Sequence, residues 1–163
     1  MILVNKLKLA LEDFALCGGC EIALADLGAE LLSLLDEDMD LVYAPVLASA
    51  TDYENADVTL LIGAIRNQHD LERVKAARKK SKILVAFGTC PSSVGLVGLA
   101  NLYDPDELVK SAYPTESAGE RSKDLLKKVE PVYKHVQVDY IIPGCPPPAP
   151  VIKQMFRKIL GGK

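Results

Sequence analysis

The 163-residue sequence predicts an α/β fold, namely one domain built on a doubly wound parallel sheet. Two continuous apolar runs, residues 57–63 and 83–87, have the pattern of strands that are buried on both faces. Segments with helical spacing of apolar side chains alternate with such runs, which is the order that gives a parallel sheet. We find no internal repeat and no linker, so we expect a single domain over residues 1–163.

The first half of the chain supplies three expected strands and one helix. Residues 8–11 form a short apolar segment that predicts a first strand. Apolar positions recur at helical spacing over residues 21–37, which predicts a helix after a glycine-rich turn. Residues 40–46 predict a second strand that Pro45 stops, and residues 57–63 predict a third.

The second half continues the alternation. Residues 67–81 predict a polar, amphipathic helix, because a basic run closes the segment and suits a helix C-terminus. The buried strand at residues 83–87 follows it directly. Residues 92–136 hold many turn signals and are harder to interpret. The remaining expected elements are short helices at 106–112 and 120–129, a strand at 138–142 and a closing helix at 151–160.

Composition excludes several classes of function. The 19 Lys and Arg residues against 22 Asp and Glu give a net charge of −3, so the chain lacks the basic footprint of a nucleic-acid-binding protein. The longest apolar runs are too short to cross a bilayer, so we expect no membrane insertion. The N-terminal residues do not resemble a secretory signal, and we expect a cytoplasmic protein.

The four cysteines follow predicted strands. Cys17 and Cys20 come after the first strand, Cys90 after the strand at 83–87, and Cys145 after the strand at 138–142. Loops at the carboxyl ends of parallel strands meet in one crevice, where ligands bind. We therefore expect four thiols from three distant segments to lie together as metal ligands.

An iron–sulfur cluster is the favoured interpretation of these cysteines, because glycines and prolines flank them and allow backbone N–H groups to approach sulfur. Three alternatives remain open. A structural zinc site would usually show two Cys-x-x-Cys pairs, and this chain has one. A redox dithiol at Cys17 and Cys20 would leave Cys90 and Cys145 unexplained. The cysteines could also be unrelated buried thiols.

Three motifs together resemble the small subunit of nickel–iron hydrogenases. They are Cys17-Gly-Gly-Cys20-Glu-Ile-Ala-Leu, Gly88-Thr-Cys90 and Pro143-Gly-Cys145-Pro-Pro. The resemblance is nearest to the cytosolic, methyl-viologen-reducing branch, and the superfamily includes the 20-kDa cluster subunit of respiratory complex I. Complex I subunits begin the motif with adjacent cysteines, whereas two glycines separate Cys17 from Cys20 here. This spacing favours the hydrogenase branch.

The resemblance implies a flavodoxin-like fold and one proximal 4Fe–4S cluster held by Cys17, Cys20, Cys90 and Cys145. It also implies that the chain is an electron-transfer subunit of an oxidoreductase and no catalytic subunit itself, since the two Cys-x-x-Cys pairs that bind nickel are missing. The implied partners are a nickel–iron large subunit and a further iron–sulfur or flavin electron-transfer subunit. The alternatives are a complex I-like cluster subunit of another oxidoreductase and a structural metal-binding scaffold.

Two residues beside the motifs have open roles. Glu21 follows Cys20 and is expected to stabilise the first helical turn, although a role in proton movement at a subunit interface is the alternative. Ile62 precedes Gly63 at a position where many hydrogenases resembling this chain have an acidic residue. The sequence therefore gives no support for a proton or gating role at Ile62.

Overall fold

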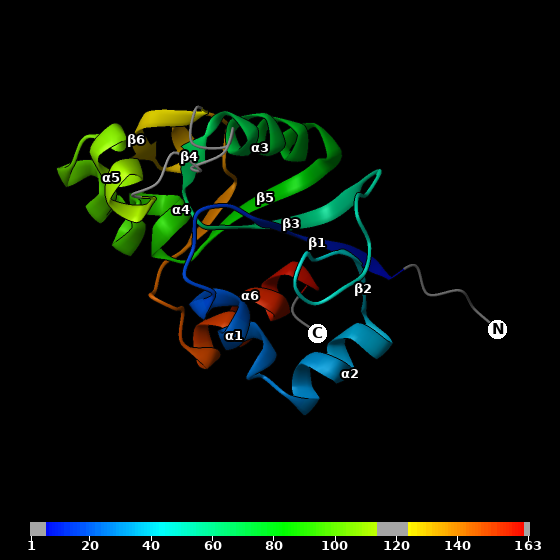
Figure 1. Cartoon of the computed structure of the whole chain (residues 1–163). Coiled ribbons are helices and arrows are strands. Elements are labelled where there is room, and N and C mark those ends of the chain that lie inside the picture. Colours follow the sequence, from blue (N-terminus) through cyan, green and yellow to red (C-terminus); the bar gives the residue numbers. More distant parts are fainter. Residues whose placement is uncertain (1–5, 114–123, 162–163) are drawn as a thin grey trace.

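A five-stranded parallel sheet in the order β2-β1-β3-β5-β7 forms the centre of the computed structural model, which describes residues 6–113 and 124–161 (Figure 1). The strands are β1 (Leu7–Asp13), β2 (Met39–Tyr43), β3 (Ala56–Ile62), β5 (Ser81–Phe87) and β7 (Tyr140–Ile142). All neighbouring pairs in this sheet are parallel. Numbered within the sheet, the order is 2-1-3-4-5, the flavodoxin-like arrangement. The predicted fold class is confirmed.

Helices cover both faces of this sheet. In Figure 1, α1, α2 and α6 lie on one side, and α3 lies on the other with a small antiparallel pair, β4 and β6. The helices and the small strands are α1 (Gly19–Ala25), α2 (Ala29–Glu37), β4 (Ile65–Asn67), α3 (Gln68–Lys80), α4 (Thr89–Ser93), the 3₁₀ helix η1 (Gly95–Leu102), α5 (Pro105–Ala112), β6 (Leu125–Glu130), the 3₁₀ turn η3 (Val132–Lys134) and α6 (Ala149–Ile159).

Alternation along the central strands explains why their sequences are almost continuously apolar. In β5, Val85 and Phe87 join the core beneath α1 and α6, whereas Leu84 and Ala86 join the core beneath α3. Successive side chains of a strand point to opposite faces, so a strand covered on both sides needs apolar residues at every position. The apolar layers on both faces hold the sheet in place. The loops that carry the cysteines follow the carboxyl ends of its strands.

Two expected elements are wrong. The helix expected over residues 21–37 is two helices, because Gly28 has a φ of 57° and breaks the chain between α1 and α2. The helix expected over residues 120–129 is also wrong for residues 124–129, the part that the structure describes. Residues from Leu125 onward form β6, which pairs antiparallel with β4. Residues 120–123 of that expected helix lie outside the described residues.

The other expected elements are present with shifted ends. The second strand stops at Tyr43, two residues before Pro45, and the expected strand at 138–142 keeps only Tyr140–Ile142. In α3, the Asn67 side chain accepts a hydrogen bond from the Asp70 N–H at 2.7 Å, so Asn67 caps the helix rather than joining it. No helix in the described part of the chain has the length and apolarity needed to cross a membrane. The single-domain expectation for residues 1–163 stays a prediction.

Candidate metal centre

The turn after β1 carries the first two cysteines. After Asp13 the chain forms a single bridge between Ala15 and Ala64 and then turns at Gly18, which has a φ of 84°. This left-handed conformation is available to glycine at little cost. It lets α1 begin at Gly19, inside the Cys-x-x-Cys motif, so that Cys17 lies just before the helix and Cys20 in its first turn.

Cys90 follows β5 at the start of α4. Gly88, with a φ of 101°, joins this strand to the helix, and a Cβ at this position would lie 2.6 Å from the Cys20 Sγ. A side chain there would overlap the sulfur atom. Gly88 therefore allows Cys20 to approach the loop that carries Cys90.

The loop after β7 brings in Cys145. The Gly88 N–H donates to the Ile142 carbonyl at 2.8 Å, and the Thr89 N–H donates to the Gly144 carbonyl at 2.8 Å. These two backbone hydrogen bonds tie the loops after β5 and β7 together. Cys145 is consequently held across from Cys90, although the two residues are distant in sequence.

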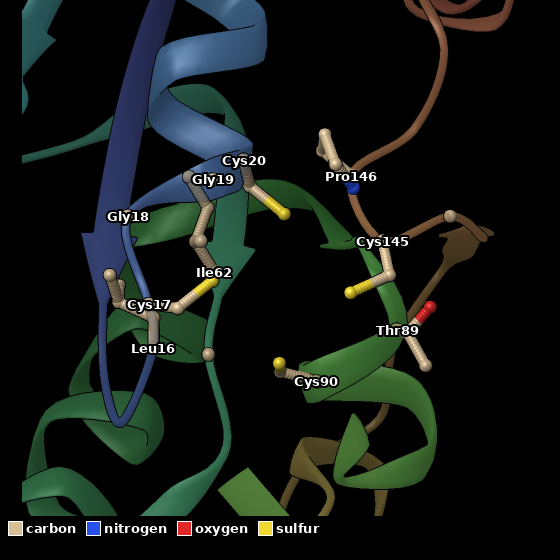
Figure 2. A pocket seen from close by; sticks show the side chains of 12 residues that line it. Leu16, Cys17, Gly18, Gly19, Cys20, Ile62, Thr89, Cys90, Cys145 and Pro146 are labelled. Carbon is tan, nitrogen blue, oxygen red and sulfur yellow. The ribbon is translucent and has the colours of Figure 1, made fainter. Parts of the chain in front are cut away.

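All four predicted cysteines line one pocket, with a cavity of about 60 Å³. Figure 2 shows their sulfur atoms turned toward a shared space, from three separate stretches of chain. The cavity is several times the roughly 10–15 Å³ that one water molecule needs. The other lining residues are uncharged: Leu16, Gly18, Gly19, Ile62, Gly63, Thr89, Gly144 and Pro146. The expected convergence of the cysteines is therefore found, and their role as ligands stays a prediction.

Four cysteine thiolates are a ligand set that both iron–sulfur clusters and structural zinc sites use. Among the described residues, no group of three or more His, Cys, Asp or Glu side chains is positioned to hold a single metal ion. Zinc–thiolate bonds of about 2.3 Å would draw four sulfur atoms close together. Cluster-binding thiolates can lie farther apart, because each binds a different iron atom. The donor set and the cavity fit a four-cysteine iron–sulfur cluster.

Burial disfavours the thiolate form of two of the four cysteines. Burial raises the pKa of Cys20 to about 12, and the nearby Cys90, Cys17 and Cys145 act in the same direction. Burial likewise raises the pKa of Cys90, opposed by hydrogen bonds from backbone N–H groups. Metal binding deprotonates a thiol outright and supplies the positive charge that such a set of sulfur atoms lacks.

Sequence reasoning missed a carboxyl pair beside the cysteine turn. Glu21 lies in the first turn of α1, as expected, and is buried. Its carboxyl group lies beside that of Asp13, whose two oxygens are inaccessible to solvent and have no partner within hydrogen-bonding geometry. Burial and the neighbouring Glu21 raise the pKa of Asp13 to about 7, so Asp13 can hold a proton near neutral pH. The adjacent acidic residues of β1 were the available signal.

Ile62 is also part of the pocket. Its side chain is buried at the carboxyl end of β3 and lines the cavity together with Gly63. An apolar side chain here carries no proton and excludes water. Ile62 therefore contributes apolar surface to the pocket.

The comparisons with known proteins agree with the fold and the motifs. The family model described as "NADH ubiquinone oxidoreductase, 20 Kd subunit" matches residues 17–159. A subunit of the F420-non-reducing hydrogenase vhu of Methanococcus voltae is 40% identical over 153 residues, which cover 89% of this chain and 53% of that relative. The subunit of the same name from Methanocaldococcus jannaschii is 38% identical over 96% of this chain and 57% of its own length. The chain thus spans about half the length of these curated relatives.

A solved structure is similar over nearly its whole length. A chain of an NAD⁺-reducing [NiFe]-hydrogenase in the H₂-reduced state superposes with a TM-score of 0.84 at 30% identity, over 98% of this chain and 93% of that one. The resemblance to nickel–iron hydrogenase small subunits is confirmed by these matches. Because the family model covers most of the sequence, including all four cysteines, the chain belongs to the family of the 20-kDa subunit of NADH:ubiquinone oxidoreductase.

Proposed function

We propose that this chain binds one 4Fe–4S cluster through Cys17, Cys20, Cys90 and Cys145 and relays electrons within a nickel–iron hydrogenase complex. The observation that carries the proposal is the meeting of four thiols from three remote segments in one uncharged pocket. The hydrogenase names of the similar proteins support the kind of complex. When bound, the cluster would supply one-electron oxidation and reduction.

The chain's own residues would hold the cluster and keep water from it. The backbone of the glycine-containing loops would approach the sulfur atoms closely, since Gly88 leaves room for Cys20. Leu16, Ile62 and Pro146 present apolar surface to the cavity. On the buried side of the pocket, an apolar and uncharged lining strengthens hydrogen bonds to sulfur.

The site is open toward solvent on one side. Cys17 and Cys145 are exposed, whereas Cys90 is buried. A partner's redox centre could therefore approach the cluster from the side of the two exposed cysteines. We propose that a nickel–iron large subunit docks there and that a further iron–sulfur or flavin subunit exchanges electrons with the same cluster.

Anaerobic purification with iron and sulfide assays tests the cluster. We expect about four iron and four sulfide per chain and an EPR signal on reduction. In Cys90→Ala, iron should fall by more than half and the wild-type EPR signal should disappear, because one of four ligands is lost. The matched control is Ser93→Ala, an exposed residue of the same helix, which should keep full iron. Zinc without an EPR signal would overturn the proposal.

Co-purification from the native source tests the complex. A nickel-containing large subunit among the associated proteins is the expected result. The second candidate is a complex I-like cluster subunit of another oxidoreductase, which the description of the matching family favours. A partner without nickel, together with an intact cluster, would select that candidate and contradict the hydrogenase assignment.

A further inference from the structure

The turn between α4 and η1 contains a strained residue. Val94 has a φ of 71° and a ψ of −28°, and it is the one non-glycine residue with positive φ in the described part of the chain. A β-branched residue in this region is a genuine outlier, because its Cβ crowds the backbone. Such strain persists only where the surrounding structure holds it, and it concentrates at functional sites.

Three contacts hold Val94 in this conformation. Its N–H donates to the Cys90 carbonyl at 2.9 Å and closes α4. Its side chain packs over Gly98, where an added Cβ would lie 2.9 Å from the Val94 Cγ1. The same side chain joins a small apolar cluster with Cys90 and Val129. The strained turn is therefore fixed directly beside a candidate ligand.

The consequence of the turn is that the chain folds back onto the Cys90 sulfur. At Gly95, which has a φ of 53°, an added Cβ would lie 3.0 Å from the Cys90 Sγ and 3.2 Å from its nitrogen. The first N–H groups of η1 have no partner inside that helix. Those of Leu96 and Val97 donate hydrogen bonds to Cys90 instead. Cys90 is only 7% exposed, so water does not compete strongly for these donors.

We infer that residues 94–97, the Cys90 turn, position the Cys90 thiolate and raise the reduction potential of the cluster through the N–H groups of Leu96 and Val97. Reduction adds negative charge to the cluster and its sulfur ligands, and N–H donors stabilise that charge. This inference rests on the proposed function, since it requires a cluster at Cys90. It adds to that function a segment that lies outside the cysteine motifs.

A proline at position 96 tests one donor. Leu96→Pro removes the N–H near the start of η1, where proline is tolerated, and Leu96→Ala changes the same exposed side chain but keeps the N–H. In the anaerobically purified complex, an EPR-monitored redox titration should give a more negative midpoint potential for Leu96→Pro than for Leu96→Ala. Equal potentials in two variants with full iron would overturn the inference.

A spectroscopic measurement covers the case in which the proline variant does not fold. In the unmutated complex labelled with ¹⁵N-valine, pulsed EPR of the reduced cluster should detect a coupling to a peptide ¹⁵N, because the Val97 N–H bonds to a ligand sulfur. In the Val97→Ile variant, prepared with ¹⁵N-valine and unlabelled isoleucine, position 97 carries no ¹⁵N. This coupling should therefore weaken or disappear. Absence of any ¹⁵N coupling in the valine-labelled complex, or an unchanged spectrum in Val97→Ile, would overturn the inference.

The two levels of failure are distinguishable. A wild-type complex without iron or an EPR signal contradicts the proposed function itself. A wild-type complex with a reducible four-iron cluster, but with the same potential in both Leu96 variants, contradicts only the role of the Cys90 turn.

Discussion

Single glycines decide how closely the cysteine loops approach one another. At Gly88 both backbone conformation and space exclude a side chain, since its φ is 101° and a Cβ would lie 2.6 Å from the Cys20 Sγ. Gly28 also has a positive φ, of 57°, but nothing lies within 4 Å of its would-be Cβ. Comparing substitutions at the two positions distinguishes the effect of backbone strain from the effect of overlap with the Cys20 sulfur.

Gly88→Ala should lose at least half of the bound iron. The added methyl group would push the Cys20 sulfur away from the pocket, in addition to a backbone strain of roughly 1–3 kcal/mol. Gly28→Ala carries comparable strain and should keep its iron. Iron content and thermal unfolding of both variants provide the check. Equal iron in the two variants would show that Gly88 does not control the approach of Cys20.

The buried Asp13 predicts a pH dependence of stability. Its pKa is raised to about 7 in the folded protein, chiefly by burial, from the ordinary value of 3.8 in a free chain. The folded state therefore binds a proton more tightly, and this contribution to the free energy of unfolding declines as pH rises from about 4 to about 7. Burial also raises the pKa of Glu12, so Glu12 contributes to the same decline.

Asp13→Asn isolates the first of these carboxyl groups. The variant should lose less stability than the wild type between pH 5 and pH 8, by roughly 1–3 kcal/mol, because an amide does not titrate. Unfolding of both proteins at the two pH values measures the difference. Identical pH dependence would mean that Asp13 does not hold a proton in the folded protein at pH 5.

At the scale of elements, one ion pair links α3 to the sheet. Arg73 of α3 pairs with the buried Glu12 of β1 and donates a hydrogen bond to the Tyr43 hydroxyl of β2 at 2.9 Å. Removing the arginine would leave the Glu12 charge buried without its partner. Lys82 and Asp57 form a contrasting pair, in which the lysine side chain is 80% exposed.

Arg73→Ala should destabilise the protein by roughly 2–4 kcal/mol, since breaking a buried pair leaves an uncompensated charge. Lys82→Ala should cost less than about 1 kcal/mol, because an exposed pair contributes little. Denaturant unfolding of both variants tests the contrast. A loss of similar size in the two variants would contradict the structural role assigned to the Glu12–Arg73 pair.

The sequence predicted elements well where local pattern and burial agreed. The run of residues 57–63 lies at β3, because apolar side chains at successive positions suit a strand covered on both faces. The expected single helix over residues 21–37 was wrong because apolar residues recur at helical spacing on both sides of Gly28. The spacing gives no sign that Gly28 interrupts the helix. At β6 the decisive interaction is remote, since Leu125 pairs with Asn67. Local periodicity does not contain that information.

In the candidate site, too, some features follow from the sequence and others do not. Cys17, Cys90 and Cys145 each follow a strand, so the topology of a parallel sheet was enough to predict that they meet. The Cys90 turn was not predictable, because valine rarely adopts the positive φ found at Val94. Tertiary packing against Gly98 overrides that preference. The donors to the Cys90 sulfur are backbone N–H groups, which nearly every residue type carries, so the sequence does not reveal them.

At the scale of the whole molecule, the five-stranded sheet and the helices on its two faces form the core, and Ile62 belongs both to this core and to the pocket lining. The cysteines lie at one edge of this core, with Cys17 and Cys145 exposed. The core places the loops, and the exposed side leaves room for a partner. This arrangement suits a subunit that holds a redox centre close to the centre of a neighbouring protein.

X-ray anomalous scattering from crystals of the anaerobically purified protein tests the central claim most directly. Data collected above and below the iron absorption edge should show iron density enclosed by the sulfur atoms of Cys17, Cys20, Cys90 and Cys145, with every one of them bonded to iron. One of the four sulfur atoms beyond bonding reach of that iron, or a signal at the zinc edge instead, would contradict a cluster held by these four cysteines.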